Sequence, residues 1–333
     1  MTVLDFFKNK KVGVVGLGKT GQSVVDALMA GGADVKVHDD NLGRSFNLDE
    51  NFDAIVVSPS ISLLWPKVHP IIQMAREKFI PILNDIDLWQ KQLSRKKTIC
   101  ITGTNGKSTT TALVHYLLNF AGKNVDIGGN FGNPILSLNS DADSFVLELS
   151  SYQLESCSIL GFDTAILLNI TPDHLTRHGG MEGYVAAKQK IFANFHERSV
   201  AVIGVDDHHC LKIFNFLKAI NHPCVIPISG NSVPKFGIGW DRNELIDDRF
   251  GFREIICEKK SDLDGDHNRQ NIAAAYAAYV SSGSKQELFR TGLSSFKGLE
   301  HRQEIVATID GVQYVNDSKA TNADSVEKAL QRF

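Results

Sequence analysis

Short apolar runs alternate with longer amphipathic segments along most of the chain, a pattern that predicts β-α-β units on a mostly parallel sheet. In the first part a helix is expected over residues 21–32, where two glycines mark its C-terminal end. The strands expected around this helix are residues 11–17, 34–39 and 53–60. The charged run "QKQLSRKK", residues 90–97, interrupts the pattern and is expected to be a linker.

A second α/β block follows this run, and its strands are continuous apolar stretches of the kind that helices cover on both faces. They are residues 98–102, 144–150, 164–171 and 199–205. Residues 208–262 are more polar and are expected to be irregular, with "GIGW" and "DDRFGF" as turns or edge strands. An Ala-rich helix over residues 268–283 restores order, and a strand, a loop and a helix follow between residues 311 and 330.

Composition narrows the class of protein. The 333 residues suffice for two domains and part of a third, and 43% apolar with 22% charged residues is ordinary for a globular protein. A net charge of −3 gives no basic field for nucleic acid. The five cysteines form no C-x-x-C pair, and no run reaches the roughly 20 apolar residues of a membrane span. We therefore expect a soluble, cytoplasmic protein.

The stretch "ITGTNGKST", residues 101–109, predicts a phosphate loop between a strand and a helix. Backbone N–H groups at the helix N-terminus would hold phosphates. Lys107 would reach the β and γ oxygens, and the Ser108 hydroxyl would ligate Mg²⁺. A standard P-loop would need glycine where this chain has Ile101, so the alternative is a glycine turn with a surface lysine.

An earlier run, Gly16-x-Gly18-x-x-Gly21, also follows a predicted strand. Such glycines allow a tight turn and close packing of helix on strand, whatever the ligand. Asp39, after the next strand, would accept a ribose hydroxyl or would be a solvated strand end. A nicotinamide cofactor, and so an NAD-dependent oxidoreductase, is one interpretation. With a triphosphate loop downstream, the more economical one is a nucleotide diphosphate bound as substrate.

Three further side chains are candidates for chemistry in the second block. Glu148 ends a predicted buried strand, where open α/β sheets bind ligands, and could hold Mg²⁺ or simply point outward from an edge strand. His174 follows another apolar strand and is either a metal or substrate contact or a structural histidine. Lys188 lies in a helical run, where a lysine is ordinarily solvated.

Nine motifs together resemble the Mur ligases, the ATP-dependent amide-forming enzymes of peptidoglycan synthesis. In order they are "GLGKTG", "TGTNGKST", "GGNFGNP", "ELSSYQLE", "NITPDHLTRH", "AAKQKIF", "GDHNRQN", "HR" at 301–302 and "NDSKATN". The last is the most discriminating. It favours the activity that adds D-glutamate to UDP-N-acetylmuramoyl-L-alanine.

The resemblance implies an α/β protein of three parts. A Rossmann-like domain that binds the UDP-substrate would span residues 1–92, and a central P-loop ATPase-type domain with a mostly parallel sheet would span residues 93–297. Residues 298–333 would begin a C-terminal α/β domain that is mostly missing here. We therefore expect this chain to be inactive or impaired, and a nucleotide-binding module without catalysis is the alternative.

The resemblance also assigns roles to residues. For ATP they are Gly103, Thr104, Asn105, Gly106, Lys107, Ser108, Thr109, Asn271, Arg302 and Asp317. For the UDP-substrate they are Gly18, Thr20, Gly21, Asp39, Asp40, Asn41, Ser58, Ser60, Asn130, Gln153 and His174. For the metal they are Ser108, Glu148, His174 and Lys188, the last as a carbamylated lysine. Lys107, Glu148, His174 and Lys188 would be catalytic, and Lys319 and Thr321 match the junction with the third domain.

The implied reaction is stepwise. The substrate carboxylate attacks the γ-phosphate of ATP to give an acyl phosphate, which the amine of D-glutamate then attacks. Two anions approach each other in the first step, so Lys107 and two Mg²⁺ ions would neutralise them. Arg302 would add phosphate contacts. The expected partners are thus UDP-N-acetylmuramoyl-L-alanine, D-glutamate and ATP, bound by a monomer.

Overall fold

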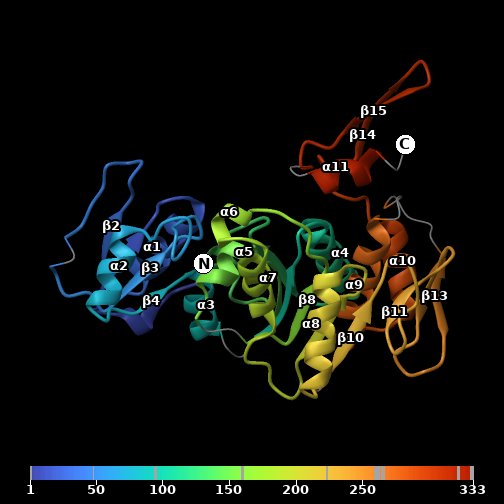
Figure 1. Ribbon diagram of the computed structural model, residues 1–333, viewed down its shortest axis with the longest axis horizontal. Helices are drawn as coiled ribbons and strands as arrows, with labels where there is room; N and C mark the ends of the chain where they lie inside the picture. Colours follow the sequence, from blue (N-terminus) through green and yellow to red (C-terminus); the bar gives the residue numbers. More distant parts are fainter. Residues whose placement is uncertain are drawn as a thin grey trace. The chain divides into compact units, whose positions relative to one another are not determined.

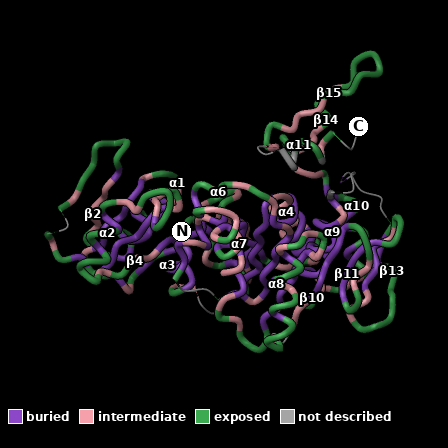
Figure 2. The backbone as a smooth tube through the Cα atoms, in the orientation of Figure 1, coloured by how far each residue is buried: buried purple, intermediate pink, exposed green. Residues whose placement is uncertain are grey.

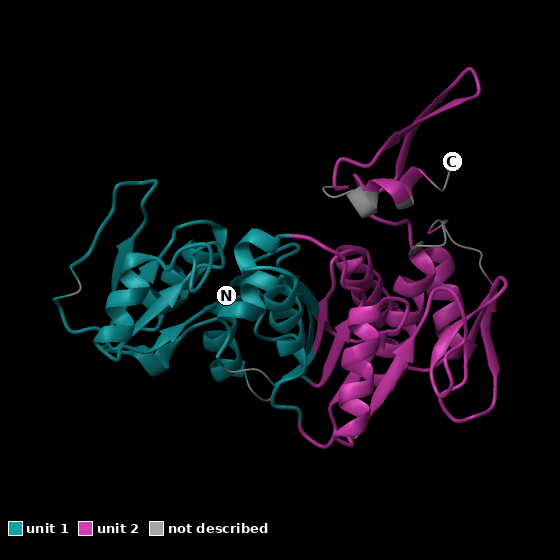
Figure 3. Ribbon diagram, viewed as in Figure 1, with its two compact units in different colours: residues 1–98, 126–162, 174–195 teal, residues 99–125, 163–173, 196–333 magenta. Residues whose placement is uncertain are grey.

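The computed structural model describes residues 2–47, 49–93, 96–158, 161–222, 224–258, 263, 267–320 and 323–330, so that Thr321 lies outside the described residues. Figure 3 shows the two compact units that the chain forms. Unit 1 comprises residues 1–98, 126–162 and 174–195, and unit 2 comprises residues 99–125, 163–173 and 196–333. The division predicted at residues 92/93 and 297/298 stays a prediction.

A four-stranded parallel sheet opens unit 1, in the order β2-β1-β3-β4 (Figure 1). Its strands are β1 (Lys11–Val15), β2 (Asp34–His38), β3 (Ala54–Val57) and β4 (Ile82–Leu83), and the helices of this region are α1 (Lys19–Ala30), α2 (Pro70–Glu77) and α3 (Asp85–Leu93). The strands β2 and β3 lie on opposite sides of β1, so the strand order reverses there. In open α/β sheets ligands bind outside the carboxyl end of such a strand.

A second sheet has nine strands in the order β13-β12-β11-β10-β9-β8-β5-β7-β6. They are β5 (Lys97–Thr102), β6 (Val125–Gly129), β7 (Ser144–Glu148), β8 (Thr164–Leu167), β9 (Val200–Gly204), β10 (Val225–Ile228), β11 (Ile238–Asp241), β12 (Glu244–Asp247) and β13 (Glu254–Glu258). The pairs from β5 through β8, β9 and β10 to β11 are parallel, and β11, β12 and β13 pair antiparallel. The strand order reverses at β5, which leads into the second glycine turn.

The helices associated with this sheet are α4 (Lys107–Phe120), α5 (Ser151–Ser156), α6 (Leu175–His178), α7 (Met181–Gln189), α8 (His208–Ala219), α9 (His267–Ser281) and α10 (Glu287–Ser295). Short 3₁₀ turns lie at Asp5–Phe7, Ile135–Ser137 and Lys190–Phe192. The strands β7, β8 and β9 are almost wholly buried, as their continuous apolar sequences predict. Figure 2 shows that buried backbone fills the interior of each unit. The chain then forms the hairpin β14 (Glu304–Ile309) and β15 (Val312–Asn316), followed by α11 (Ala323–Leu330).

Two expectations about elements were wrong, and one strand was not predicted. Residues 90–93 end the helix α3 instead of forming a linker, because that helix buries Ile86, Leu88 and Trp89. The segment expected to be irregular contains α8, whose N-terminus is capped by Asp207 and whose buried residues recur at helical spacing. The strand β14 was missed because its exposed residues do not alternate cleanly between two faces. Among the described residues, no helix is long and apolar enough to cross a membrane.

Candidate active site

The second glycine turn lies in unit 2, between β5 and α4. Gly103 and Gly106 have φ values of +159° and +85°, the positive region that glycine adopts most readily. A Cβ on Gly106 would lie 2.2 Å from the Asn271 Oδ1 atom, so this position also requires the absence of a side chain. The Lys107 Nζ atom donates to the carbonyl oxygens of Gly103 (2.9 Å) and Thr104 (2.6 Å). The turn therefore holds a cation directly over its own backbone.

A chain of amide groups fixes this turn from one side. The Asn169 side chain accepts from the Asn105 N–H (2.9 Å) and donates to the Asn105 carbonyl (3.1 Å). It also donates to the Gln270 Oε1 atom (3.1 Å), and Gln270 in turn donates to Asp206 Oδ2 (2.9 Å). We call Asn169, Gln270 and Asp206 the amide relay. The group that contacts the turn, the Asn169 amide, is uncharged. The carboxylate of Asp206 lies at the other end of the relay, beyond Gln270.

Unit 2 brings four of the predicted ATP residues together at the start of α4. Arg302 Nη2 donates to Ser108 Oγ (2.8 Å), and the Thr110 hydroxyl donates to Asn271 Oδ1 (3.2 Å). Lys107 and Ser108 are the first two residues of α4 itself. Asp317 accepts from the N–H of Gln303, the residue after Arg302, at 3.2 Å. The turn thus meets two side-chain cations and a hydroxyl, which is the chemistry a magnesium nucleotide requires.

Glu148 belongs to unit 1 and ends β7, as predicted. Its side chain is buried, and its Oε1 atom accepts from Asn130 Nδ2 at 2.6 Å. Within the part of the chain that the structure describes, its Oε2 atom is buried without a hydrogen-bond partner. A buried carboxylate oxygen of this kind is costly unless it meets a cation or a donor. The residues present therefore fit a divalent metal ion at this position.

His174 and Lys188, both predicted as metal-side residues, also belong to unit 1. His174 caps α6 with a left-handed φ of +51°, and its ring centroid lies 5.2 Å from that of Tyr152. Lys188 lies in α7 and is only 1% exposed, with Nζ 4.8 Å from the centre of the Tyr184 ring. The alternative of a solvated surface lysine is therefore wrong. Whether Lys188 is carbamylated stays a prediction.

Gln153, predicted to contact the muramoyl part, is buried within α5. Its Oε1 atom accepts from the Ser150 N–H (3.0 Å) and closes a capping box. Its side chain also hydrogen-bonds Asp85, whose pKa burial raises to about 7. The structure thus gives Gln153 a structural role at the start of α5, and its substrate contact remains a prediction.

The first glycine turn, in unit 1, is held by a carboxylate. Asp39 Oδ2 accepts from the Leu17 N–H (2.6 Å), and Oδ1 accepts from the Asn41 (3.0 Å) and Leu42 (3.1 Å) N–H groups. These bonds, that from Leu17 foremost, lower the pKa of Asp39. Asp39 is therefore not a solvated strand end, because it joins the turn to the loop that follows β2; its contact with a ribose stays a prediction.

Four more predicted UDP residues, Gly18, Thr20, Gly21 and Ser58, lie at this turn. The Ser58 hydroxyl donates to the Gly16 carbonyl (2.7 Å), whereas Ser60 is exposed. A Cβ on Gly21 would lie 1.8 Å from that carbonyl, but one on Gly18 would meet no atom within 4 Å. Gly18 and Thr20 flank the start of α1. The turn is thus closed at Gly21 and open at Gly18, where a diphosphate could approach the backbone.

Asp40 accepts from two histidines and forms the one cluster with metal-ligand spacing among the described residues. Its oxygens lie 2.9 Å from His38 Nε2 and 3.1 Å from His69 Nε2, and both contacts lower its pKa. An ionised carboxylate only accepts, so both Nε2 atoms carry protons. His69 Nδ1 accepts from the Ile71 N–H, which favours the same tautomer. In this structure the cluster is therefore a hydrogen-bonded clamp.

Comparison with known proteins decides the family. The sequence model of one protein family, the Mur ligase middle domain, matches residues 101–279. The UDP-N-acetylmuramoylalanine–D-glutamate ligase of Rhodospirillum rubrum is 41% identical over 98% of this chain and 73% of its own length. The chain belongs to the Mur ligase family. A second ligase of that name, from Phenylobacterium zucineum, is 40% identical over 100% of this chain and 76% of its own length.

Solved Mur ligase structures share the fold. The UDP-N-acetylmuramate–alanine ligase of Thermotoga maritima covers 97% of this chain with a TM-score of 0.58 at 21% identity. A UDP-N-acetylmuramate:L-alanyl-γ-D-glutamyl-meso-diaminopimelate ligase from Neisseria covers 88% with a TM-score of 0.61 at 19% identity. The expected fold class, a Rossmann-like and a P-loop ATPase-type domain with mostly parallel sheets, is confirmed.

Three residues inside the Mur ligase motifs make contacts that were not predicted from the sequence. Asn169 and Arg177 lie inside the motif "NITPDHLTRH", in which only His174 was predicted to be functional. Gln270 lies inside "GDHNRQN", in which only Asn271 was predicted to be functional. Asn169 and Arg177 bind mainly backbone atoms far away in sequence, and Gln270 binds the distant side chains of Asn169 and Asp206, so that no spacing rule reveals these pairs.

Proposed function

We propose that this Mur-family chain acts in the ATP-dependent addition of D-glutamate to UDP-N-acetylmuramoyl-L-alanine, as an acid–amino-acid ligase of peptidoglycan synthesis. The supporting geometry is the second glycine turn, where Lys107 and Arg302 bring two cations to the start of α4. The supporting likeness is the identity of about 40% to ligases with that name. ATP would bind the second turn, and the UDP end of the substrate would bind the first.

In the first step the chain's own cationic side chains would stabilise the charge that develops on the phosphates. Lys107 and Arg302 would balance the charge that accumulates as the substrate carboxylate attacks the γ-phosphorus and ADP leaves. The amine of D-glutamate would then attack the acyl carbon, and inorganic phosphate would leave. The residues that would hold two Mg²⁺ ions are Ser108 in unit 2 and Glu148, His174 and carbamylated Lys188 in unit 1; when bound, these ions neutralise phosphate oxygens. The buried oxygen of Glu148 supports this assignment.

The test uses the chain as it is. Titration calorimetry would measure the affinity for ATP with Mg²⁺, for UDP-N-acetylmuramoyl-L-alanine and for NADH, and mass spectrometry would detect the D-glutamyl product. Product formation that releases one phosphate per amide bond would support the proposed ligase, even at the low rate expected of an impaired chain. Binding of ATP and the UDP-substrate without product would favour the second candidate, a nucleotide-binding module without catalysis. NADH binding without ATP binding would overturn both in favour of an oxidoreductase.

A further inference from the structure

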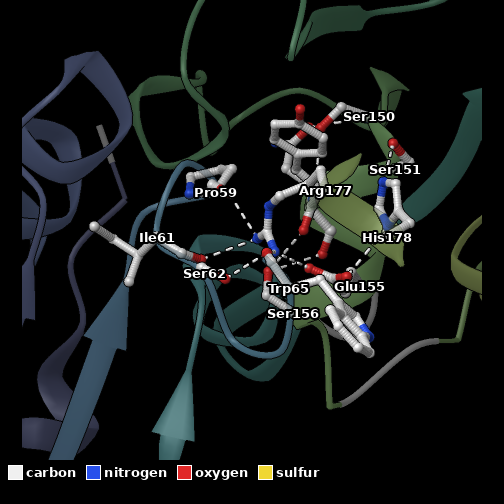
Figure 4. A network of polar contacts seen from close by, with 12 residues as sticks. Pro59, Ile61, Ser62, Trp65, Ser150, Ser151, Glu155, Ser156, Arg177 and His178 are labelled. Atoms are coloured by element: carbon white, nitrogen blue, oxygen red, sulfur yellow. Dashed lines mark hydrogen bonds and ion pairs between the residues drawn. The ribbon is translucent and has the colours of Figure 1, made fainter. Parts of the chain in front are cut away.

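A buried charged network in unit 1 joins the loop after β3 to the short helix α6 (Figure 4). Arg177, which is 8% exposed, lies at its centre. Its Nη1 atom lies 2.8 Å from Glu155 Oε2 and donates to the Trp65 carbonyl (3.2 Å). Its Nη2 atom donates to the carbonyls of Ile61 (3.0 Å) and Pro59 (3.5 Å). One guanidinium therefore binds three carbonyls of a single loop.

The other half of the network fixes Arg177 in place. Glu155 Oε1 lies 3.2 Å from His178 Nδ1, and His178 Nε2 lies 3.0 Å from the Ser151 hydroxyl. The carboxylate can only accept, so Nδ1 carries the proton of this contact. The guanidinium also lies 5.0 Å from the centre of the Tyr152 ring. Arg177 is thus ion-paired with Glu155 and lies over the Tyr152 ring, both on α5, while His178 of its own helix α6 contacts the same Glu155.

This network joins a segment assigned to UDP binding with a segment assigned to metal binding. Residues 58–65 include Ser58 and Ser60, which are predicted to face UDP. Arg177 follows His174, a predicted metal-side residue, by three positions. We propose that Arg177 is a positioning residue for the ligase reaction: it fixes the UDP-facing loop against the segment that carries His174. The inference rests on the proposed function, because it assigns the loop to the UDP-substrate.

An arginine suits this role for a geometric reason. A planar guanidinium presents donors in a rigid fork, whereas a lysine ammonium is a point charge on a flexible stem. Lysine at position 177 would keep the charge opposite Glu155 but could not reach the carbonyls on both sides of the fork. Substitution to lysine therefore separates the positioning of the loop from the simple neutralisation of Glu155.

A second contact holds the same loop and provides an independent variant. Gly179 has a φ of +69°, and a Cβ built on it would lie 2.7 Å from the Trp65 Nε1 atom. The Trp65 indole thus lies directly on the backbone at Gly179. Trp65 is 53% exposed, whereas the other tryptophans, Trp89 and Trp240, are buried. Quenching of fluorescence by acrylamide therefore reports mainly on Trp65.

The test compares Arg177→Lys and Gly179→Ala with Arg249→Lys, a matched control. Arg249 is also partly buried and ion-paired, to Asp247 at 2.7 Å, but lies in unit 2. Calorimetry would measure the affinity for UDP-N-acetylmuramoyl-L-alanine and for ATP. We expect both unit 1 variants to bind the UDP-substrate about 10-fold or more weakly, since a displaced loop misaligns its ligand. ATP affinity should change by less than about 2-fold, because Lys107 and Arg302, the residues proposed to bind the triphosphate, belong to unit 2.

Trp65 quenching should increase in the two unit 1 variants and stay unchanged in the control. Unchanged substrate affinity in Arg177→Lys would overturn the inference, whether or not quenching increases. If Gly179→Ala alone weakened binding, the loop would matter but Arg177 would not hold it, which also overturns the inference. Failure of the unsubstituted chain to bind the UDP-substrate would instead count against the proposed function. Circular dichroism would verify that each variant is folded.

Discussion

The two glycine turns of this chain both connect a parallel strand to a helix, yet they are held in opposite ways. The first, residues 16–21, gives the Leu17 N–H to the carboxylate of Asp39 at 2.6 Å. The second, residues 103–106, is held by the uncharged side chain of Asn169 and lies beneath the Lys107 ammonium. One turn therefore has a negative charge on its backbone, and the other has a positive one.

This difference explains how similar glycine patterns can serve different ligands. A triphosphate that reacts needs its charge neutralised, and the second turn concentrates cations for that purpose. The first turn uses one of its N–H groups on an internal carboxylate, so it offers less to a dense anion. A diphosphate that is only bound, as part of a larger substrate, needs less of its charge neutralised. The contrast supports assigning ATP to the second turn and the UDP end to the first.

The largest effect is expected from removing the cation of the second turn. Lys107→Ala should weaken ATP binding roughly 10- to 100-fold, the value of a charge-assisted contact of about 1.5–3 kcal/mol, and should abolish acyl-phosphate formation. Binding of the UDP-substrate should persist. Lys19→Ala is the matched control, because Lys19 also opens a helix after a glycine turn but is exposed. If calorimetry showed that both variants lose the same ATP affinity, the proposed difference between the two glycine turns would be contradicted.

The glycines of the first turn should separate stability from binding. Gly21→Ala places a Cβ 1.8 Å from the Gly16 carbonyl, so the helix and the turn must move apart. Overpacking of this kind costs about 1–3 kcal/mol, which urea unfolding would measure.

Gly18→Ala is the control for that substitution, since its Cβ would meet no atom within 4 Å. The stability of this variant should hold, while its affinity for the UDP-substrate falls if the diphosphate approaches the turn there. A Gly18→Ala chain that binds the UDP-substrate normally would move the ligand away from this turn.

The sequence predicted the elements that depend on local pattern. Glu148 ends a buried strand and Lys107 begins a helix where expected, because apolar periodicity and glycine punctuation are local signals. The helix α8 was missed because the exposed apolar residues Leu211 and Phe216 mask the spacing of the buried Cys210, Ile213 and Leu217. Local pattern was thus reliable where burial is continuous, and less so where a helix is half exposed.

Contacts between distant residues could not be predicted. Arg177 binds the carbonyls of Ile61 and Trp65, more than 100 positions away, and every residue type has a carbonyl. Asp39 was noticed for its place after a strand, but its bond to the Leu17 N–H depends on how the turn is folded. In both cases one partner is backbone, so the sequence has no second signal that would reveal the pair.

A moderate effect is expected where the amide relay meets the second turn. Asn169→Ala leaves the Asn105 N–H and carbonyl without their side-chain partner, at a cost of about 1–2 kcal/mol in the free energy of unfolding. ATP affinity should fall with it, while affinity for the UDP-substrate should not. Asn139→Ala, at an exposed loop position, is the control. Equal loss of affinity for both ligands would show that the relay supports the whole fold instead of this turn.

The smallest effect is expected at Asp39, and it should depend on pH. The pKa of Asp39 is lowered, chiefly by the Leu17 N–H, so the folded chain binds this proton less readily than the unfolded chain. Its stabilisation is therefore fully present above the unfolded pKa of about 4 and is lost as the pH falls through the lower folded value. Asp39→Asn should unfold at a slightly lower temperature than the unsubstituted chain at pH 7. This difference in unfolding temperature should become smaller below about pH 4. Asp26→Asn, on the exposed face of α1, should show no such narrowing. A gap for Asp39→Asn that stayed constant with pH would mean that the charge is not what holds the first turn, and the contrast between the two turns would then be one of shape alone.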